Sequence, residues 1–173
     1  DRLFQLEVWR RQATGTLAEV LGPDAVERDI GARLLRFRGD MRAEMRHYHD
    51  RGDEIIPAFV RGVNARIAQV RADPSLLPIE FRLLGWRPEP WTPEVVISRH
   101  GGLVSNLTQE LSLGRAVAAI GAPAVKAHQR FHPGDPDIDL DPAIDSTALA
   151  GDILRYYSAY KSSVRFRAAD LEA

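Results

Sequence analysis

The chain contains no cysteine and only two lysines, Lys126 and Lys161, among its 173 residues. The absence of cysteine excludes disulfide bonds, cysteine-ligated zinc and a thiol nucleophile within this chain. An excess of either charge is also missing, because 23 Lys and Arg face 24 Asp and Glu and the formal net charge is -1. This balance gives no electrostatic reason to expect binding to nucleic acid or to an anionic membrane. No apolar run approaches the roughly 20 residues of a membrane-spanning helix.

Several catalytic and targeting patterns are absent as well. The sequence has no G-x-S-x-G nucleophile motif and no glycine-rich phosphate loop around Gly101 and Gly102. It has no secretory signal pattern, and it opens on Asp1 within a helical pattern. We expect from this opening that an upstream segment was removed or trimmed.

Apolar residues at helical spacing dominate the chain, and no strong strand pattern interrupts them. The predicted helices cover residues 1–22, split by Gly15, and then 24–38, 54–70, 93–104, 107–120 and 146–166. The predicted fold class is therefore mostly α, with residues 1–173 forming one helical segment. Wide apolar faces on these helices allow two arrangements: they pack on one another, or they cover a sheet that belongs to another chain.

Two groups of residues have the spacing of metal ligands. His128 and His132 lie four residues apart, but Gln129 stands where a zinc-protease motif has Glu, so a surface pair is the favoured interpretation. The alternating aspartates Asp135, Asp137, Asp139 and Asp141 resemble half of a calcium loop. This run has Leu140 where an EF-hand needs Gly and Ser146 where it needs Glu, which favours a solvated loop.

Other conspicuous side chains have simpler interpretations. The three tryptophans are expected in a core or an interface, and the many arginines are expected to be salt-bridged or to extend along the surface. His100 is the histidine nearest to the predicted pocket described below, and a partly buried, hydrogen-bonded imidazole is favoured there. A self-contained hydrolase that uses His100 with a carboxylate is a weaker hypothesis, because no nucleophile accompanies it.

Four stretches, in order, closely resemble the α subunit of the penicillin amidase family of N-terminal-nucleophile hydrolases. They are DRLFQLEVWRRQATGTLAEVLG (1–22), PAFVRGVNARI (57–67), LPIEFRLLGWRPEPWTPEVV (77–96) and NLTQELSLGRAVAAIG (106–121). The resemblance covers residues 1–121. Residues 122–173 form a predicted loop and C-terminal helix that are not distinctive. The family's α chain normally has an earlier segment, so the resemblance implies that this chain lacks it.

The resemblance implies a function that is divided between two chains. A precursor cleaves itself, and this helical α chain packs on an αββα core supplied mainly by a separate β chain. The N-terminal Ser of the β chain attacks an amide carbonyl with its own α-amino group as the base, and an acyl-enzyme forms and is hydrolysed. The implied substrates are N-acyl amides such as a β-lactam, an acyl-homoserine lactone or an acyl-peptide. The implied location is the bacterial periplasm or the medium outside the cell.

The resemblance also assigns roles to residues of this chain. Val104, Leu107 and Thr108 occupy positions that line the acyl pocket, and none of them is catalytic. Leu107 stands where penicillin G-type members carry Arg, and Thr108 replaces a bulky aromatic side chain, which predicts an aliphatic acyl group. Glu110 matches the α-chain ligand of a structural Ca²⁺, whose other ligands must come from the β chain. The alternative to this reading is a non-enzymatic helical interaction domain.

Overall fold

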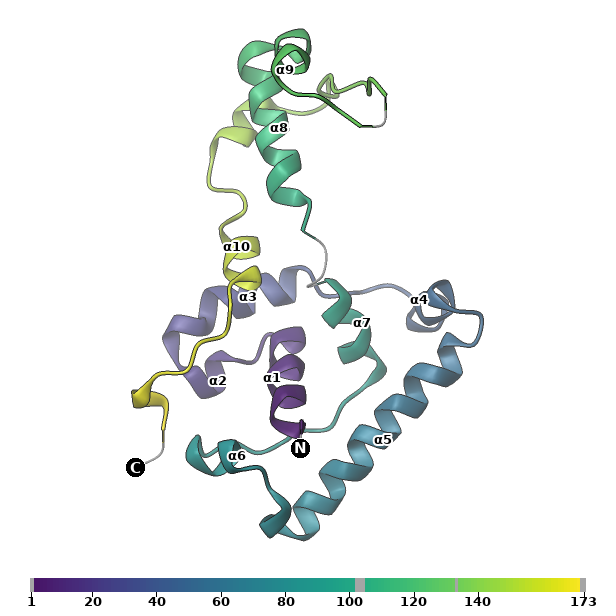
Figure 1. The fold of residues 1–173 in the computed structure, drawn as a ribbon, viewed down its shortest axis with the longest axis vertical. Helices are drawn as coiled ribbons and strands as arrows, with labels where there is room; N and C mark the ends of the chain where they lie inside the picture. The colour runs from purple at the N-terminus through teal and green to yellow at the C-terminus, as the bar shows by residue number, and fades with distance from the viewer. Residues whose placement is uncertain (1, 102–104, 133, 172–173) are drawn as a thin grey trace. The chain divides into compact units, whose positions relative to one another are not determined.

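The computed structural model describes residues 2–101, 105–132 and 134–171, and every regular element among them is helical (Figure 1). The α-helices are α1 (Leu3–Thr14), α2 (Ala18–Leu21), α3 (Val26–Leu34), α4 (Met41–Tyr48), α5 (Gly52–Ala72), α6 (Ile79–Leu83), α7 (Pro93–Gly101), α8 (Leu107–Ile120), α9 (Ala122–His128) and α10 (Arg155–Lys161). Four short 3-10 helices are η1 (Pro23–Ala25), η2 (Pro74–Leu76), η3 (Ser146–Ala150) and η4 (Ala168–Asp170). The mostly α class is confirmed for the described residues, while the expected sheet of a partner chain stays a prediction.

The chain divides into two compact units. Unit 1 comprises Asp1–Leu103 with Tyr156–Ala173, and unit 2 comprises Val104–Arg155. The core of unit 1 includes Val63, Ile67, Phe81, Trp86 and Trp91, each at most 8% exposed. Unit 2 has a small core of its own, made of Val117, Ala122 and Val125. The expectation that residues 1–173 act as one subunit segment stays a prediction.

The first helix pair breaks at Gly15, as the sequence predicts. Gly15 ends α1 in the left-handed conformation, with φ 65°, which glycine adopts without steric cost. Asp29 of α3 then accepts hydrogen bonds from the backbone N–H groups of Leu17 (3.0 Å) and Ala18 (2.7 Å). Because these groups lie at the start of α2, a carboxylate from another helix caps it.

A buried carboxylate joins α1 to the proline-rich segment before α7. Glu7 is only 1% exposed, and its Oε1 lies 2.7 Å from Arg10 Nη2 and 2.8 Å from Arg11 Nε. Its Oε2 accepts a hydrogen bond from the backbone N–H of Glu89 at 3.0 Å. The Arg11 guanidinium also lies over the Trp86 ring, 5.6 Å from its centroid. The PEPW segment (residues 88–91) is thus held against α1 by the Glu7 carboxylate, whose negative charge is compensated by two arginines of the same helix.

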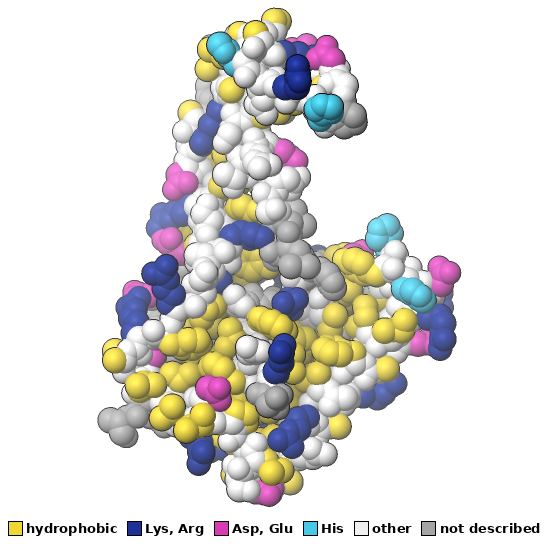
Figure 2. Space-filling view, in the orientation of Figure 1, with side chains coloured by type: hydrophobic (Ala, Val, Ile, Leu, Met, Phe, Trp, Pro, Cys, Tyr) yellow, Lys and Arg dark blue, Asp and Glu magenta, His cyan; other side chains and the backbone are white. Residues whose placement is uncertain are grey.

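The longest helix, α5, packs one side into the core of unit 1. Val60, Val63, Ile67 and Val70 are buried at helical spacing, whereas Ile55 and Phe59 of the same helix remain 50% and 49% exposed. Figure 2 shows hydrophobic side chains gathered over α1, α2 and α6, and again between α5 and α7. The apolar residues of unit 1 are therefore only partly covered.

The helical prediction is less accurate after residue 120. Gly121 ends α8 as predicted, but α9 follows at once, with Pro123 in its first turn, a favourable place for proline. The single helix predicted over 146–166 is wrong, because η3 and α10 are separate. Gly151 between them is extended, with ψ 173°, and this conformation ends the helical path.

Candidate functional site

Three of the predicted pocket and calcium residues, Leu107, Thr108 and Glu110, lie in the first turn of α8, in unit 2. Leu107 is half-buried there, while Thr108 and Glu110 are exposed. Val104 lies outside the described residues. The structure thus places three of the four predicted site residues on one helical turn, and their roles as pocket wall and metal ligand stay predictions.

Glu110 has a carboxylate of the kind that Ca²⁺ prefers. The side-chain amide of Asn106, at the position preceding α8, donates a hydrogen bond to Glu110 Oε1. Among the residues that the structure describes, no group of three or more His, Cys, Asp or Glu side chains could hold a metal ion. Since Ca²⁺ takes six to eight oxygen ligands, a calcium site at Glu110 would need its other ligands from elsewhere.

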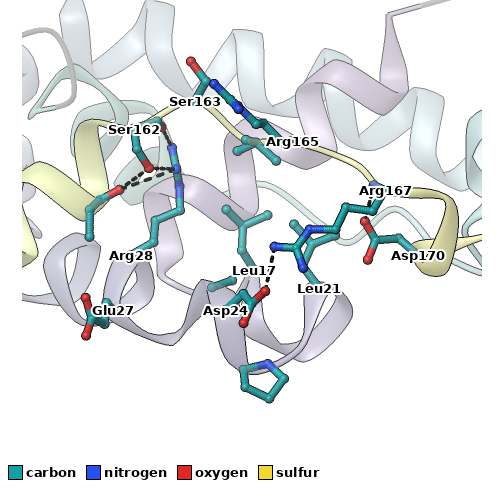
Figure 3. Close-up of a pocket in the computed structure, with 14 residues that line it drawn as sticks. Leu17, Leu21, Asp24, Glu27, Arg28, Ser162, Ser163, Arg165, Arg167 and Asp170 are labelled. Carbon is teal, nitrogen blue, oxygen red and sulfur yellow. Dashed lines mark hydrogen bonds and ion pairs between the residues drawn. The ribbon is translucent and has the colours of Figure 1, made fainter.

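One pocket lies within unit 1, between the α2–η1–α3 region and the C-terminal segment (Figure 3). Its volume is about 470 Å³, and Leu17, Leu21 and Val164 form part of its apolar lining. Arg28 reaches from α3 across to the C-terminal segment, where Nη1 donates to Ser162 Oγ at 2.8 Å and Nη2 donates to the Ser162 carbonyl. Arg167 forms an ion pair with Asp24 at 2.6 Å.

The expectation that the arginines are salt-bridged or extend along the surface is wrong for Arg28. Its side chain is 8% exposed, and burial lowers the pKa of its guanidinium although the negative charge of Asp29 opposes that shift. Its guanidinium holds backbone and hydroxyl groups of the C-terminal segment, so the contacts shown in Figure 3 indicate a structural role. No sequence signal separates this arginine from the others, because only the tertiary contacts bury it.

The remaining candidates occupy the places expected of surface or core residues. His128 and His132 are both exposed, and so are Asp135, Asp137, Asp139 and Asp141. Two of these aspartates cap local turns: Asp137 accepts from the N–H of Asp139 at 3.0 Å, and Asp141 from that of Ala143 at 2.8 Å. Trp86 and Trp91 are buried, as predicted. The side chain of His100 lies outside the described part of the chain.

Comparison with known proteins identifies relatives over most of the sequence. The penicillin amidase family model matches residues 1–150. The penicillin acylase 2 proenzyme of Pseudomonas sp. (strain SE83) is 35% identical over 157 residues, which are 88% of this chain and 20% of that protein. Penicillin G acylase of Escherichia coli is 36% identical over 107 residues, which are 61% of this chain and 13% of that protein. Acyl-homoserine lactone acylase QuiP of Pseudomonas aeruginosa is 34% identical over 116 residues, covering 65% of this chain and 13% of that protein.

These matches cover only part of each relative. The chain spans a fifth or less of the length of the three curated relatives. Within the described residues, no helix is both long and apolar enough to cross a membrane.

Proposed function

The chain belongs to the penicillin amidase family, and we propose that it forms part of the α subunit of a heterodimeric N-acyl amide hydrolase. The observation that carries this proposal is the family match over residues 1–150. It is supported by three relatives that are named as acylases and share 34–36% identity with the chain. The name of the first relative includes the word proenzyme, in keeping with two chains that come from one precursor.

In the proposed reaction, bond-making belongs to the partner β chain. The hydroxyl oxygen of its N-terminal Ser attacks the carbonyl carbon of the N-acyl amide, and the α-amino group of the same residue accepts the hydroxyl proton. Donors on the β chain stabilise the oxyanion. The C–N bond then breaks as the α-amino group passes this proton to the leaving nitrogen, and the neutral amine departs. Water then hydrolyses the ester and releases the acid. The substrate is an N-acylated amine: a β-lactam, an acyl-homoserine lactone or an acyl-peptide.

The proposed part of this chain is to shape and stabilise the site. Val104, Leu107 and Thr108 line the acyl pocket. Glu110, an exposed carboxylate in the first turn of α8, supplies one ligand to a structural Ca²⁺. The proposed location is the bacterial periplasm or the medium outside the cell, as the resemblance implies.

One experiment tests the division into two chains. The intact masses and N-terminal sequences of the purified native protein are measured, and hydrolysis of chromogenic N-acyl amides is assayed on the same sample. We expect a second, larger chain that begins with Ser, Thr or Cys, together with amide hydrolysis. A folded, monodisperse protein that contains this chain alone and is inactive on all the amides would contradict the proposal and favour a helical interaction domain.

A further inference from the structure

Helix α3 of unit 1 buries charged and small residues and exposes apolar ones, which is the reverse of the usual arrangement. Its buried residues are Arg28, Asp29, Gly31 and Ala32. Three apolar side chains spaced four residues apart lie on the opposite side: Val26, Ile30 and Leu34 are 44%, 36% and 58% exposed. We call these three residues the α3 stripe. A helix on a protein surface normally turns such a stripe toward the core, so the exposure of this one calls for a partner.

Specific contacts fix the inward face of α3. Asp29 caps α2 through the N–H groups of Leu17 and Ala18, and Arg28 donates to Ser162 of the C-terminal segment. A Cβ atom at Gly31 would collide with the carbonyl oxygen of Tyr156. Rotating α3 to bury the stripe within unit 1 would break these hydrogen bonds and force that close contact. The stripe is therefore directed outward by the fold of unit 1 itself.

We propose that the α3 stripe is the surface on which the remaining polypeptide of the same proenzyme docks, an inference that rests on the proposed function. The chain spans 20% of the length of its relative from Pseudomonas sp., so the proposed enzyme contains a large polypeptide beyond this chain. An i, i+4, i+8 stripe suits an apolar helix or sheet face on the partner.

The charges beside the stripe refine the chemistry of the docking partner. Arg33, Arg36 and Arg38 follow or flank the C-terminal end of α3, and all three are exposed. Arg36 is paired with Glu94, whereas Arg38 donates to backbone carbonyl oxygens of residues 33, 34 and 36. Arg33 Nε donates to the Gly15 carbonyl oxygen at 3.0 Å, so all three arginines have partners within unit 1. The docking partner therefore needs an apolar face and no charges that match this end of the helix.

Matched variants of the whole two-chain enzyme test the docking surface. Ile30→Glu and Leu34→Glu place a charge on the stripe, whereas Ala68→Glu places the same charge at an exposed position of α5. We expect each stripe variant to lower the amount of second chain that co-purifies with this chain by about tenfold, since an aliphatic side chain that the partner covers in the complex is lost. The amount of second chain that co-purifies with the Ala68→Glu control should equal that of the wild type.

Two further measurements separate docking from folding. The amount of this chain recovered in soluble form from preparations of the whole enzyme should be the same for the wild type and all three variants, because each altered side chain is exposed within unit 1. A benzophenone amino acid at position 34 of the whole enzyme should cross-link to the second chain on irradiation. Wild-type co-purification in both stripe variants, or a cross-link only to another copy of this chain, would overturn the inference while leaving the proposed function intact. A wild-type protein that has no second chain and no amidase activity would overturn both.

Discussion

The side-chain amide of Asn64 holds both backbone polar groups of Trp91. Asn64 Nδ2 donates to the Trp91 carbonyl oxygen at 2.9 Å, and Asn64 Oδ1 accepts from the Trp91 N–H at 2.8 Å. Asn64 lies in α5, and Trp91 lies in the extended segment before α7, so one amide joins two of the three motif stretches that lie in unit 1. A carboxylate of the same size cannot replace it, because an ionised Asp side chain has no donor for the carbonyl oxygen.

Replacing Asn64 should therefore destabilise unit 1. Asn64→Ala removes both hydrogen bonds to a residue that is 4% exposed, and we expect a loss of about 2–3 kcal/mol in the free energy of unfolding. Urea unfolding followed by tryptophan fluorescence measures it. Gln69→Ala, on the exposed side of the same helix, is the control and should change the value by less than about 0.5 kcal/mol. Equal stabilities of the two variants would contradict this account of the Asn64 contact.

Neutralising Glu7 should have a larger effect, because Glu7 compensates the charge of Arg11, which is 7% exposed. Glu7→Gln keeps the size of the side chain but removes the buried carboxylate beside Arg11 and leaves this guanidinium only the exposed Glu19, 3.2 Å away. About 3 kcal/mol should therefore be lost. The exposed pair of Arg51 and Glu54 provides the control, since Glu54→Gln should cost at most about 0.5 kcal/mol. Chemical denaturation of both variants gives the comparison. A loss for Glu7→Gln no greater than that for Glu54→Gln would show that Arg11 does not depend on this carboxylate.

The turn that begins η2 should respond to acid. The Ser75 side chain, and then the Ser75 backbone N–H, donate hydrogen bonds to Asp73, and they lower the pKa of the Asp73 carboxyl below its ordinary value of 3.8. Because the folded pKa is the lower one, the stabilisation from this turn is complete above the unfolded value of 3.8 and is lost as the pH falls through the folded pKa.

Ser75→Ala removes the larger of the two causes, so the pKa of Asp73 should move back up toward 3.8. Titration of the carboxyl ¹³C signal by NMR measures the shift. Asp145, whose pKa is lowered in the same way by Thr147 in unit 2, serves as the internal control and should not move. An unchanged Asp73 titration in the Ser75→Ala variant would assign the shift to another group.

The proposed calcium role of Glu110 predicts an effect of chelation. In the whole enzyme, a calcium chelator should lower the midpoint of thermal unfolding. Glu110→Gln should start from a lower midpoint and respond less to the chelator, because one charged oxygen ligand is lost. Glu80→Gln changes an exposed carboxylate of α6 and should behave as the wild type does. Identical chelator responses in the wild type and Glu110→Gln would remove Glu110 from the ligand set.

The proposed acyl pocket predicts a preference for aliphatic substrates. Leu107 and Thr108 present an apolar and a small polar side chain where penicillin G-type members carry Arg and a bulky aromatic residue. The kcat/KM of the two-chain enzyme should therefore be higher for an aliphatic N-acyl amide than for the phenylacetyl amide of the same amine. Efficient cleavage of the phenylacetyl amide with no hydrolysis of any aliphatic one would contradict this assignment.

Much of the local structure could be predicted from the sequence because its signals are short-range. Gly15 marks the break between α1 and α2 as predicted, and α8 begins at Leu107 and ends at Ile120 as the pattern indicates. The predicted helix over 146–166 failed because its apolar spacing continues through Gly151, where the backbone is extended. The roles of Leu107, Thr108 and Glu110 rest on the family resemblance, since their local geometry is that of an ordinary first helical turn.

The sequence by itself determined the helical class, the positions of most helices in unit 1 and the family, because helical periodicity and ordered motifs are properties of neighbouring residues. Only the tertiary structure decided which face of α3 is buried. The apolar pattern of residues 24–38 allows packing in either direction, and the structure turns Arg28 and Asp29 inward while leaving the α3 stripe exposed. The reason is that Asp29 satisfies backbone groups of α2 and Arg28 satisfies groups of the C-terminal segment. Leu17 and Ala18 lie across the α2 turn from Asp29, and Ser162 lies far along the chain from Arg28. Helical periodicity within residues 24–38 specifies neither contact.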